Sequence, residues 1–149
     1  MNRYTYRAKS CGDDKWVYGS YIVIPPPPTC FGESLPETHH IAYADPRYVP
    51  DWGLPYKMVM TEVDCQTVCQ CLDIWDDNDV CIFEKDVIEF CLSEDEIPSE
   101  RWQSGCVVWS RSHGRWVVST QTTRYGFVDV VCCRVVGNRF DGGIKDELR

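Results

Sequence analysis

Apolar and polar residues alternate at the start of the chain, as they do in a strand with one buried face. Residues 4–8 show this alternation, and residues 16–24 are rich in aromatic and β-branched side chains. Residues 11–14, Cys-Gly-Asp-Asp, separate the two runs and are typical of a turn. The pattern predicts an N-terminal β-hairpin.

Proline dominates the next part of the chain. Four consecutive prolines, Pro25–Pro28, follow the hairpin, and further prolines continue through Pro55. Proline cannot donate a backbone hydrogen bond and favours the polyproline II conformation. We therefore predict a long irregular loop over residues 25–56, with the proline run as a stiff connector. The pattern leaves room for a short helix or strand inside this loop but places none.

One short helix and then a series of strands are predicted from residue 63 onward. Asp64 is a good N-cap for a helix through Gln70, because its side chain can accept hydrogen bonds from the amides of the first turn. Residues 76–79 are a turn signal. The expected strands lie at 82–83, 87–92, 105–110, 115–119 and 127–136, with a tight hairpin loop at 111–114.

Strands joined by loops and hairpins favour an antiparallel arrangement. The expected fold is mainly β, with an N-terminal β region over residues 1–62 and a second region over residues 63–149 that resembles a small antiparallel barrel. We expect the two regions to make up one unit overall. A chain of 149 residues that is 44% hydrophobic and 13% aromatic can build a real core.

Several short motifs occur in a fixed order in the centre of the chain: Val63-Asp64, Thr67-Val68, Gln70, Asp76, Asn78 and the run Ile82–Phe90. Together with Arg7–Lys9 and Trp16–Tyr21 near the start, and residues 107–118 and 135–141 near the end, they resemble the YopX family of phage and prophage proteins. The resemblance covers most of the chain, and it implies no established activity.

Three positions depart from the family's pattern. Glycine is usual in the family where this chain has Asp73, Asp79 and Lys85. Aspartate tolerates the left-handed backbone region, but lysine is strained there. Either the turn at Lys85 differs from the family's turn, or that position does not need a left-handed residue.

Ten cysteines would indicate a disulfide scaffold in a short secreted protein. However, the first six residues contain no apolar stretch of signal-peptide length, and no apolar run approaches the roughly 20 residues that cross a bilayer. We therefore expect a protein of the bacterial cytoplasm, with free thiols and no membrane association.

The net charge is −8, and the charged residues are unevenly distributed along the chain. Residues 1–62 carry 6 basic and 7 acidic groups, residues 63–100 carry 1 and 12, and residues 101–149 carry 8 and 4. A segment at −11 (1 − 12) beside one at +4 (8 − 4) indicates either an acidic face that keeps the protein soluble or a contact with a protein partner or second copy. The candidate interaction surface consists of Asp73, Asp76, Asp77, Asp79, Glu84 and Asp86.

The histidines, cysteines and carboxylates of the sequence match no known catalytic or metal-binding motif. His39 and His40 lie in the proline-rich loop and His113 in a hairpin loop, where solvated histidines are expected. The three cysteines within residues 65–71 could attract zinc, but the chain has no Cys-x-x-Cys pair. Glu84 and Asp86 are expected to hydrogen-bond backbone groups in a turn. We expect no catalytic residue, no metal and no other cofactor.

Two functions fit these observations. The first is a non-enzymatic interaction or structural module that acts through a protein partner or through self-association. The alternative is a nucleic-acid-binding protein that uses the arginines between Arg101 and Arg139, which the net charge disfavours, or a DNA mimic whose acidic segment 73–96 occupies a host DNA-binding protein.

Overall fold

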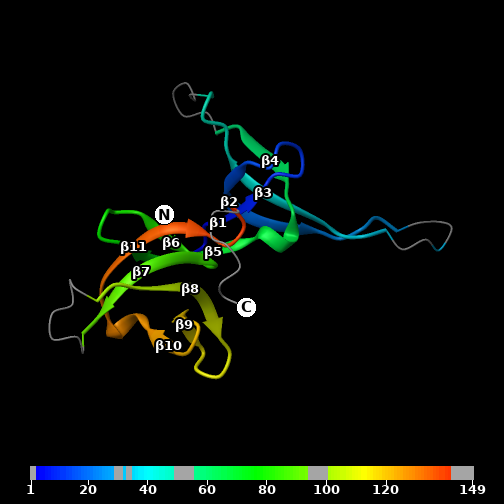
Figure 1. Ribbon diagram of the computed structural model, residues 1–149. Helices are drawn as coiled ribbons and strands as arrows, with labels where there is room; N and C mark the ends of the chain where they lie inside the picture. Colours follow the sequence, from blue (N-terminus) through cyan, green and yellow to red (C-terminus); the bar gives the residue numbers. More distant parts are fainter. Residues whose placement is uncertain (1–2, 29–31, 33–34, 49–55, 94–100, 142–149) are drawn as a thin grey trace. The chain divides into compact units, whose positions relative to one another are not determined.

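The computed structural model describes residues 3–28, 32, 35–48, 56–93 and 101–141, in which every regular element of more than three residues is a strand (Figure 1). Contacts divide the chain into a first unit, Arg3–Gln70, and a second unit that begins at Cys71. The division falls inside one strand, β5 (Cys69–Trp75), whereas the sequence pattern placed it after residue 62. Among the described residues, no helix is long and apolar enough to span a membrane.

The first unit is an antiparallel sheet. The predicted N-terminal hairpin is confirmed, because the first two strands pair from Tyr6↔Gly19 to Lys9↔Trp16. The first two residues of β5 join the other side of β1, through Tyr6↔Gln70 and Arg7↔Cys69. These strands are the first five of a six-stranded sheet in the order β4-β3-β2-β1-β5-β6, whose last strand is β6 (Cys81–Phe83). The strands are β1 (Tyr6–Lys9), β2 (Trp16–Ile24), β3 (Thr38–Ala44) and β4 (Met58–Glu62).

Within the predicted irregular loop over residues 25–56 lies one described strand, β3, for which the sequence left room without placing it, and residues 29–31, 33–34 and 49–55 of that loop lie outside the described residues. Residues 38–44 pair with the far end of β2 from Ser20↔Ala42 to Ile24↔Thr38. Prolines flank this segment on both sides but none lies within it, so its backbone is free to join a ladder. The prolines therefore mark the ends of the strand.

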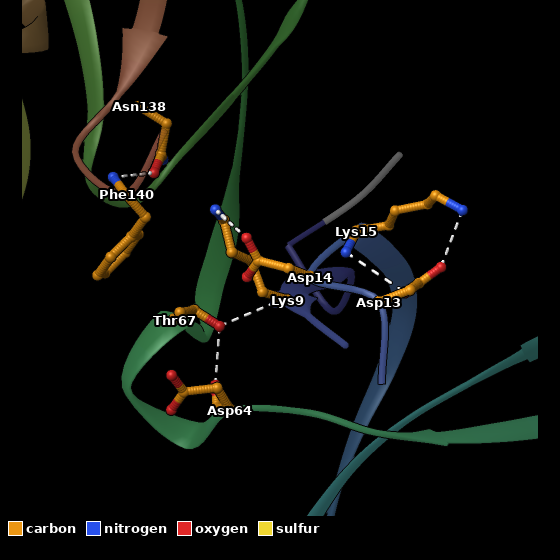
Figure 2. A network of polar contacts seen from close by, with 8 residues as sticks. All are labelled: Lys9, Asp13, Asp14, Lys15, Asp64, Thr67, Asn138 and Phe140. Carbon is orange, nitrogen blue, oxygen red and sulfur yellow. Dashed lines mark hydrogen bonds and ion pairs between the residues drawn. The ribbon is translucent and has the colours of Figure 1, made fainter. Parts of the chain in front are cut away.

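The predicted short helix is a single 3-10 turn, η1 (Cys65–Thr67). As expected, Asp64 caps it, and its side chain accepts a hydrogen bond from the Gln66 N–H. Figure 2 shows how the turn is attached to β1: the Thr67 hydroxyl donates to the Asp64 carbonyl (2.8 Å) and accepts from the Lys9 N–H (2.8 Å). The helix does not continue to Gln70, because that residue pairs with Tyr6 in the sheet.

The second unit contains an open five-stranded antiparallel sheet in the order β10-β9-β8-β7-β11. Its outermost described strands, β10 and β11, are not paired with each other, so the barrel-like region is an open sheet and not a closed barrel. A short strand, β6, pairs with the end of β5. The elements are β6 (Cys81–Phe83), β7 (Asp86–Leu92), β8 (Gln103–Ser110), β9 (Arg115–Ser119), β10 (Arg124–Gly126), the 3-10 turn η3 (Phe127–Asp129) and β11 (Val130–Asn138).

Each unit has its own apolar cluster. In the second unit, Ile88, Phe90, Val107 and Val118 are fully buried, and they alternate along β7, β8 and β9 so that one face of the sheet is apolar. The last strand is bent, because its register shifts between Val130 and Cys132 and again between Val135 and Gly137. In the first unit a smaller cluster forms around Ala8, Ile41 and Val63.

Among the residues that the structure describes, four other than glycine have left-handed backbone angles: Asp14, Asp73, Asp79 and Lys85. Asp73 and Asp79 both have φ of 60°, and Lys85 has φ of 63°. The left-handed region is therefore adopted at Lys85, in the two-residue turn between β6 and β7. The Lys85 N–H donates to the Val107 carbonyl, and its own carbonyl accepts from Arg139, so neighbouring strands hold the turn in this conformation.

Replacement of Lys85 tests the strain at this turn. Lys85→Gly should unfold at a higher denaturant concentration than Lys85→Ala, with a difference in the free energy of unfolding of about 1 kcal/mol, because only glycine is free of the Cβ clash. Both variants lose the contact of the lysine amine with the Phe140 ring, 5.1 Å from its centroid, so the comparison isolates the backbone. Equal stability of the two variants would show that Lys85 is not strained.

Candidate functional site

The turn between β5 and β6 is built around the buried carboxylate of Asp76. Its Oδ1 accepts hydrogen bonds from the N–H groups of Asn78 and Val80, both at 2.8 Å. Its Oδ2 accepts from the N–H of Val135 on β11, also at 2.8 Å. A second contact comes from Asp77, whose N–H donates to the Cys133 carbonyl at 2.9 Å. The turn is thus attached to β11 at two places.

The pKa of Asp76 lies below its ordinary value of 3.8. Burial opposes the charged form, but the N–H groups of Val135, Val80 and Asn78 together outweigh it. The carboxylate is therefore ionised whenever the protein is folded near neutral pH. A carboxylate with backbone amides as partners holds the turn more strongly than a neutral side chain can.

Asp86 has a comparable structural role at the start of β7. It is 1% exposed; its Oδ2 accepts from the Phe83 N–H at 2.8 Å, and its Oδ1 accepts from the Asn138 side-chain amide at 3.2 Å. The predicted hydrogen bond to a backbone group in this turn is confirmed for Asp86. Asn138 in turn accepts from the Phe140 N–H, as Figure 2 shows.

The six acidic residues of the candidate interaction surface therefore fall into two groups. Asp76 and Asp86 are buried and hold backbone and side-chain amides of their own unit. Asp73, Asp77 and Asp79 are exposed, and Glu84 is half-buried. The exposed three lie on one short stretch between the last residues of β5 and the start of β6.

Beside this stretch lies an apolar groove of about 340 Å³. Its most exposed side chains are Trp75 (47% exposed), Val128 (81%) and Val131 (50%). Phe127 and Val130 in its lining also pack against the core of the second unit. The full lining is Ile74, Trp75, Asp77, Phe127, Val128, Val130, Val131 and Cys133.

The hydrogen bonds of the acidic turn bring the two sides of this groove together. Trp75 and Asp77 come from the end of β5, and Val131 and Cys133 come from β11. The bonds from Asp77 to Cys133 and from Val135 to Asp76 join these two segments. The result is an exposed aromatic and aliphatic surface with a carboxylate in its lining, an arrangement typical of protein-binding surfaces.

The apolar part of this site was missed at the sequence level. Trp75 directly precedes the predicted acidic turn, so its position was visible in the sequence. Its exposure was not, because a tryptophan at the end of a strand is normally buried. Val128 lay inside a predicted strand, whereas it belongs to the 3-10 turn η3, which turns its side chain outward.

His39 and His40 do not lie in a loop as predicted, whereas His113 does. His39 and His40 are half-buried on β3, where His39 Nδ1 is hydrogen-bonded to the Tyr21 hydroxyl and His40 Nε2 to the Thr38 hydroxyl. His113 lies in the predicted hairpin loop, with its Nδ1 2.9 Å from the Ser110 hydroxyl. Ser110 is 1% exposed, so its hydroxyl is closed to a substrate. The Ser110–His113 pair therefore has the contacts of a loop-stabilising element.

The nine cysteines of the described residues are all free thiols. These residues contain no group of three or more His, Cys, Asp or Glu side chains that could hold a metal. Burial is the largest cause that raises the pKa of Cys133 to about 11, and the charges of Asp77 and Asp76 contribute to it. Burial and the neighbouring Cys71 raise the pKa of Cys81 to about 12. These thiols are protonated at neutral pH and act as small apolar side chains.

Two tryptophans and one arginine of the second sheet are engaged with neighbouring side chains. Trp109 and Trp116 face each other across β8 and β9 in an edge-to-face pair with centroids 5.1 Å apart. Arg134 donates from its Nε to Glu89 at 2.7 Å and lies over the Trp102 ring. An arginine paired with a carboxylate is less available to a phosphate group, which weakens the case for direct nucleic-acid binding.

Comparison with known proteins does not assign this chain to a family. No protein-family model, no curated protein and no solved structure matches this chain.

Replacing Asp76 tests its role in building the site. Asp76→Asn should lower the free energy of unfolding by about 2 kcal/mol, because an amide cannot accept all three backbone hydrogen bonds. Asp77→Asn removes the same charge from an exposed position and should change stability by less than about 0.5 kcal/mol. Denaturant unfolding at pH 7 measures both. Equal effects would mean that net charge, and not the hydrogen bonds of Asp76, determines the result.

The same pair of variants predicts a pH dependence. A carboxyl group whose pKa is lower in the folded state stabilises the fold above its unfolded pKa, here near 3.8, and this contribution is lost as the pH falls through the folded pKa. The stability difference between the wild type and Asp76→Asn should therefore be constant from pH 7 to about 5 and should shrink below pH 4. A difference at pH 2 as large as the one at pH 7 would contradict the assignment.

Proposed function

We propose that this chain is a non-enzymatic protein-interaction module of the YopX type, encoded by a phage or prophage and active in the bacterial cytoplasm. The observation that carries the proposal is the apolar groove of Trp75, Val128 and Val131 beside the exposed acidic residues. Exposed apolar side chains that lie together beside charged ones are a feature of protein-binding surfaces.

The partner that fits this groove is a protein segment with an apolar side chain next to a basic one. Trp75 and the two valines offer an apolar contact, and Asp77 lies in the same lining. Asp73 and Asp79 are close to it along the chain and are also exposed. An arginine or lysine of the partner would find carboxylates at the rim, which favours encounter and fixes the orientation of the segment.

The left-handed residues support the family resemblance. The three positions where the family usually has glycine, Asp73, Asp79 and Lys85, all adopt positive φ angles in this chain. Glycine is the residue that such angles favour. The glycine pattern implied by the resemblance is therefore consistent with the backbone angles of this chain.

The proposal is tested first by capture and then by measurement with a purified partner. Wild-type protein, Trp75→Ala, the double variant Asp77→Asn/Asp79→Asn and the control Glu37→Gln are used as baits in a bacterial lysate. Glu37 is an exposed carboxylate of the first unit, outside the groove. A captured protein is then purified, and its affinity for each variant is measured by calorimetry at two salt concentrations.

Trp75→Ala should weaken binding at least about 30-fold, as expected for an aromatic residue at the centre of an interface. The double variant should bind more weakly at low salt and should lose most of its salt dependence. Glu37→Gln should bind like the wild type. A partner that binds all four proteins equally would exclude the groove as its site, and a shift of mixed-sequence DNA by the wild type would favour the nucleic-acid alternative.

A further inference from the structure

The outermost strand of the first unit, β4, has an open side. Among the described residues it pairs only with β3, and it ends the strand order of its sheet. The Asp45 N–H donates to the Lys57 carbonyl, and the Val63 N–H donates to the His39 carbonyl. In an antiparallel ladder this fixes the alternation: odd-numbered residues of β4 direct their backbone groups to β3, and even-numbered ones direct them outward.

The outward backbone groups of β4 belong to Met58, Met60 and Glu62. The Glu62 carbonyl accepts a hydrogen bond from the Cys11 N–H at 3.0 Å. Met58 and Met60 thus present both an N–H and a carbonyl along the open side. These unpaired N–H and carbonyl groups alternate along the edge as they do in a β-ladder, so an extended polypeptide strand can pair with them.

The side chains from Met58 to Thr61, the central part of β4, do not block such pairing. Met58 and Met60 are 60% and 49% exposed, and no charged residue or proline occurs from Met58 to Thr61. Natural edge strands usually carry a lysine, a proline or a bulge that prevents pairing with another chain. The register Ser20↔Ala42↔Met60 places the two methionines on the same sheet face as Ile22, which is also exposed.

The strand is complementary to itself in one register. Two copies of β4 that run antiparallel with Val59 at the two-fold axis place Met58 opposite Met60 of the second copy. Each such pair exchanges both backbone hydrogen bonds, so all the outward groups of Met58 and Met60 are satisfied. In this register Lys57 lies opposite Thr61, and no like charges face each other. An axis at Met60 would place Met58 opposite Glu62, whose carbonyl is already used.

We infer that β4 is a dimerisation edge, at which two copies of this chain pair antiparallel through Met58 and Met60 with Val59 on the two-fold axis. The contact is isologous, as in most homodimers. It lies wholly in the first unit, so it does not depend on the function proposed for the groove in the second unit. Only a few residues of each copy take part, so the association is weak and the dimer forms at high protein concentration.

Two variants of Met60 separate backbone pairing from side-chain contact. Met60→Pro removes the outward N–H and leaves the ladder to β3 intact, because proline is tolerated on an edge strand where its nitrogen faces away from the sheet. Met60→Thr keeps the N–H and replaces only the side chain. Sedimentation equilibrium over a concentration series should show a dimer for the wild type and for Met60→Thr, and at least tenfold weaker association for Met60→Pro.

A charge-exchange pair tests the register even if the proline variant does not fold. With Val59 on the axis, Lys at position 60 of one copy lies opposite Glu at position 58 of the other. A mixture of Met60→Lys and Met58→Glu should therefore form a heterodimer that is tighter than either homodimer, as measured by sedimentation with one protein labelled. A monomeric wild type at all concentrations, undiminished association of folded Met60→Pro, or no preference for the heterodimer would each overturn the inference.

Discussion

The candidate site depends on one carboxylate, that of Asp76. Three backbone N–H groups from two separate segments converge on it, two from its own turn and one from β11. Without an acceptor at this point, the buried amide of Val135 would lose its partner, and the turn would lose its attachment to the last strand. Trp75 and Asp77 are the neighbours of Asp76 in sequence, so their placement beside β11 follows from the same hydrogen bonds.

The strands that the sequence predicted well are those whose signal is local. The N-terminal hairpin, the Arg111–Gly114 loop and the last strand follow from alternation and turn residues, which need no knowledge of distant partners. β3 and β4 could not be placed, because the surrounding prolines obscure their pattern and because their stability comes from pairing with β2 and with each other. The Asp64 cap was recognised, but the pairing of Gln70 with Tyr6 stops the helix after one turn.

The same distinction holds for the candidate site. The exposed positions of Asp77 and Asp79 are what an acidic turn predicts. The burial of Asp76 depends on tertiary structure, since its carboxylate accepts a hydrogen bond from Val135, 59 residues further along the chain. The exposed side chain of Trp75 is equally non-local, because it depends on what β11 and η3 leave uncovered. Composition shows that a segment is acidic. Only the fold shows which of its carboxylates are buried and stabilise the structure and which are exposed and can contact a partner.

The buried thiols can report the local opening of individual strands. Cys71, Cys81, Cys91 and Cys133 are buried on four different strands of the second unit, and only the thiolate form reacts with alkylating reagents. Each is therefore modified only when its own strand opens to solvent, at a rate set by the local opening equilibrium. Mass spectrometry after timed alkylation would rank the opening free energies of β5, β6, β7 and β11 in the native protein, without any introduced label. The cysteine content thus makes the cooperativity of this sheet directly measurable.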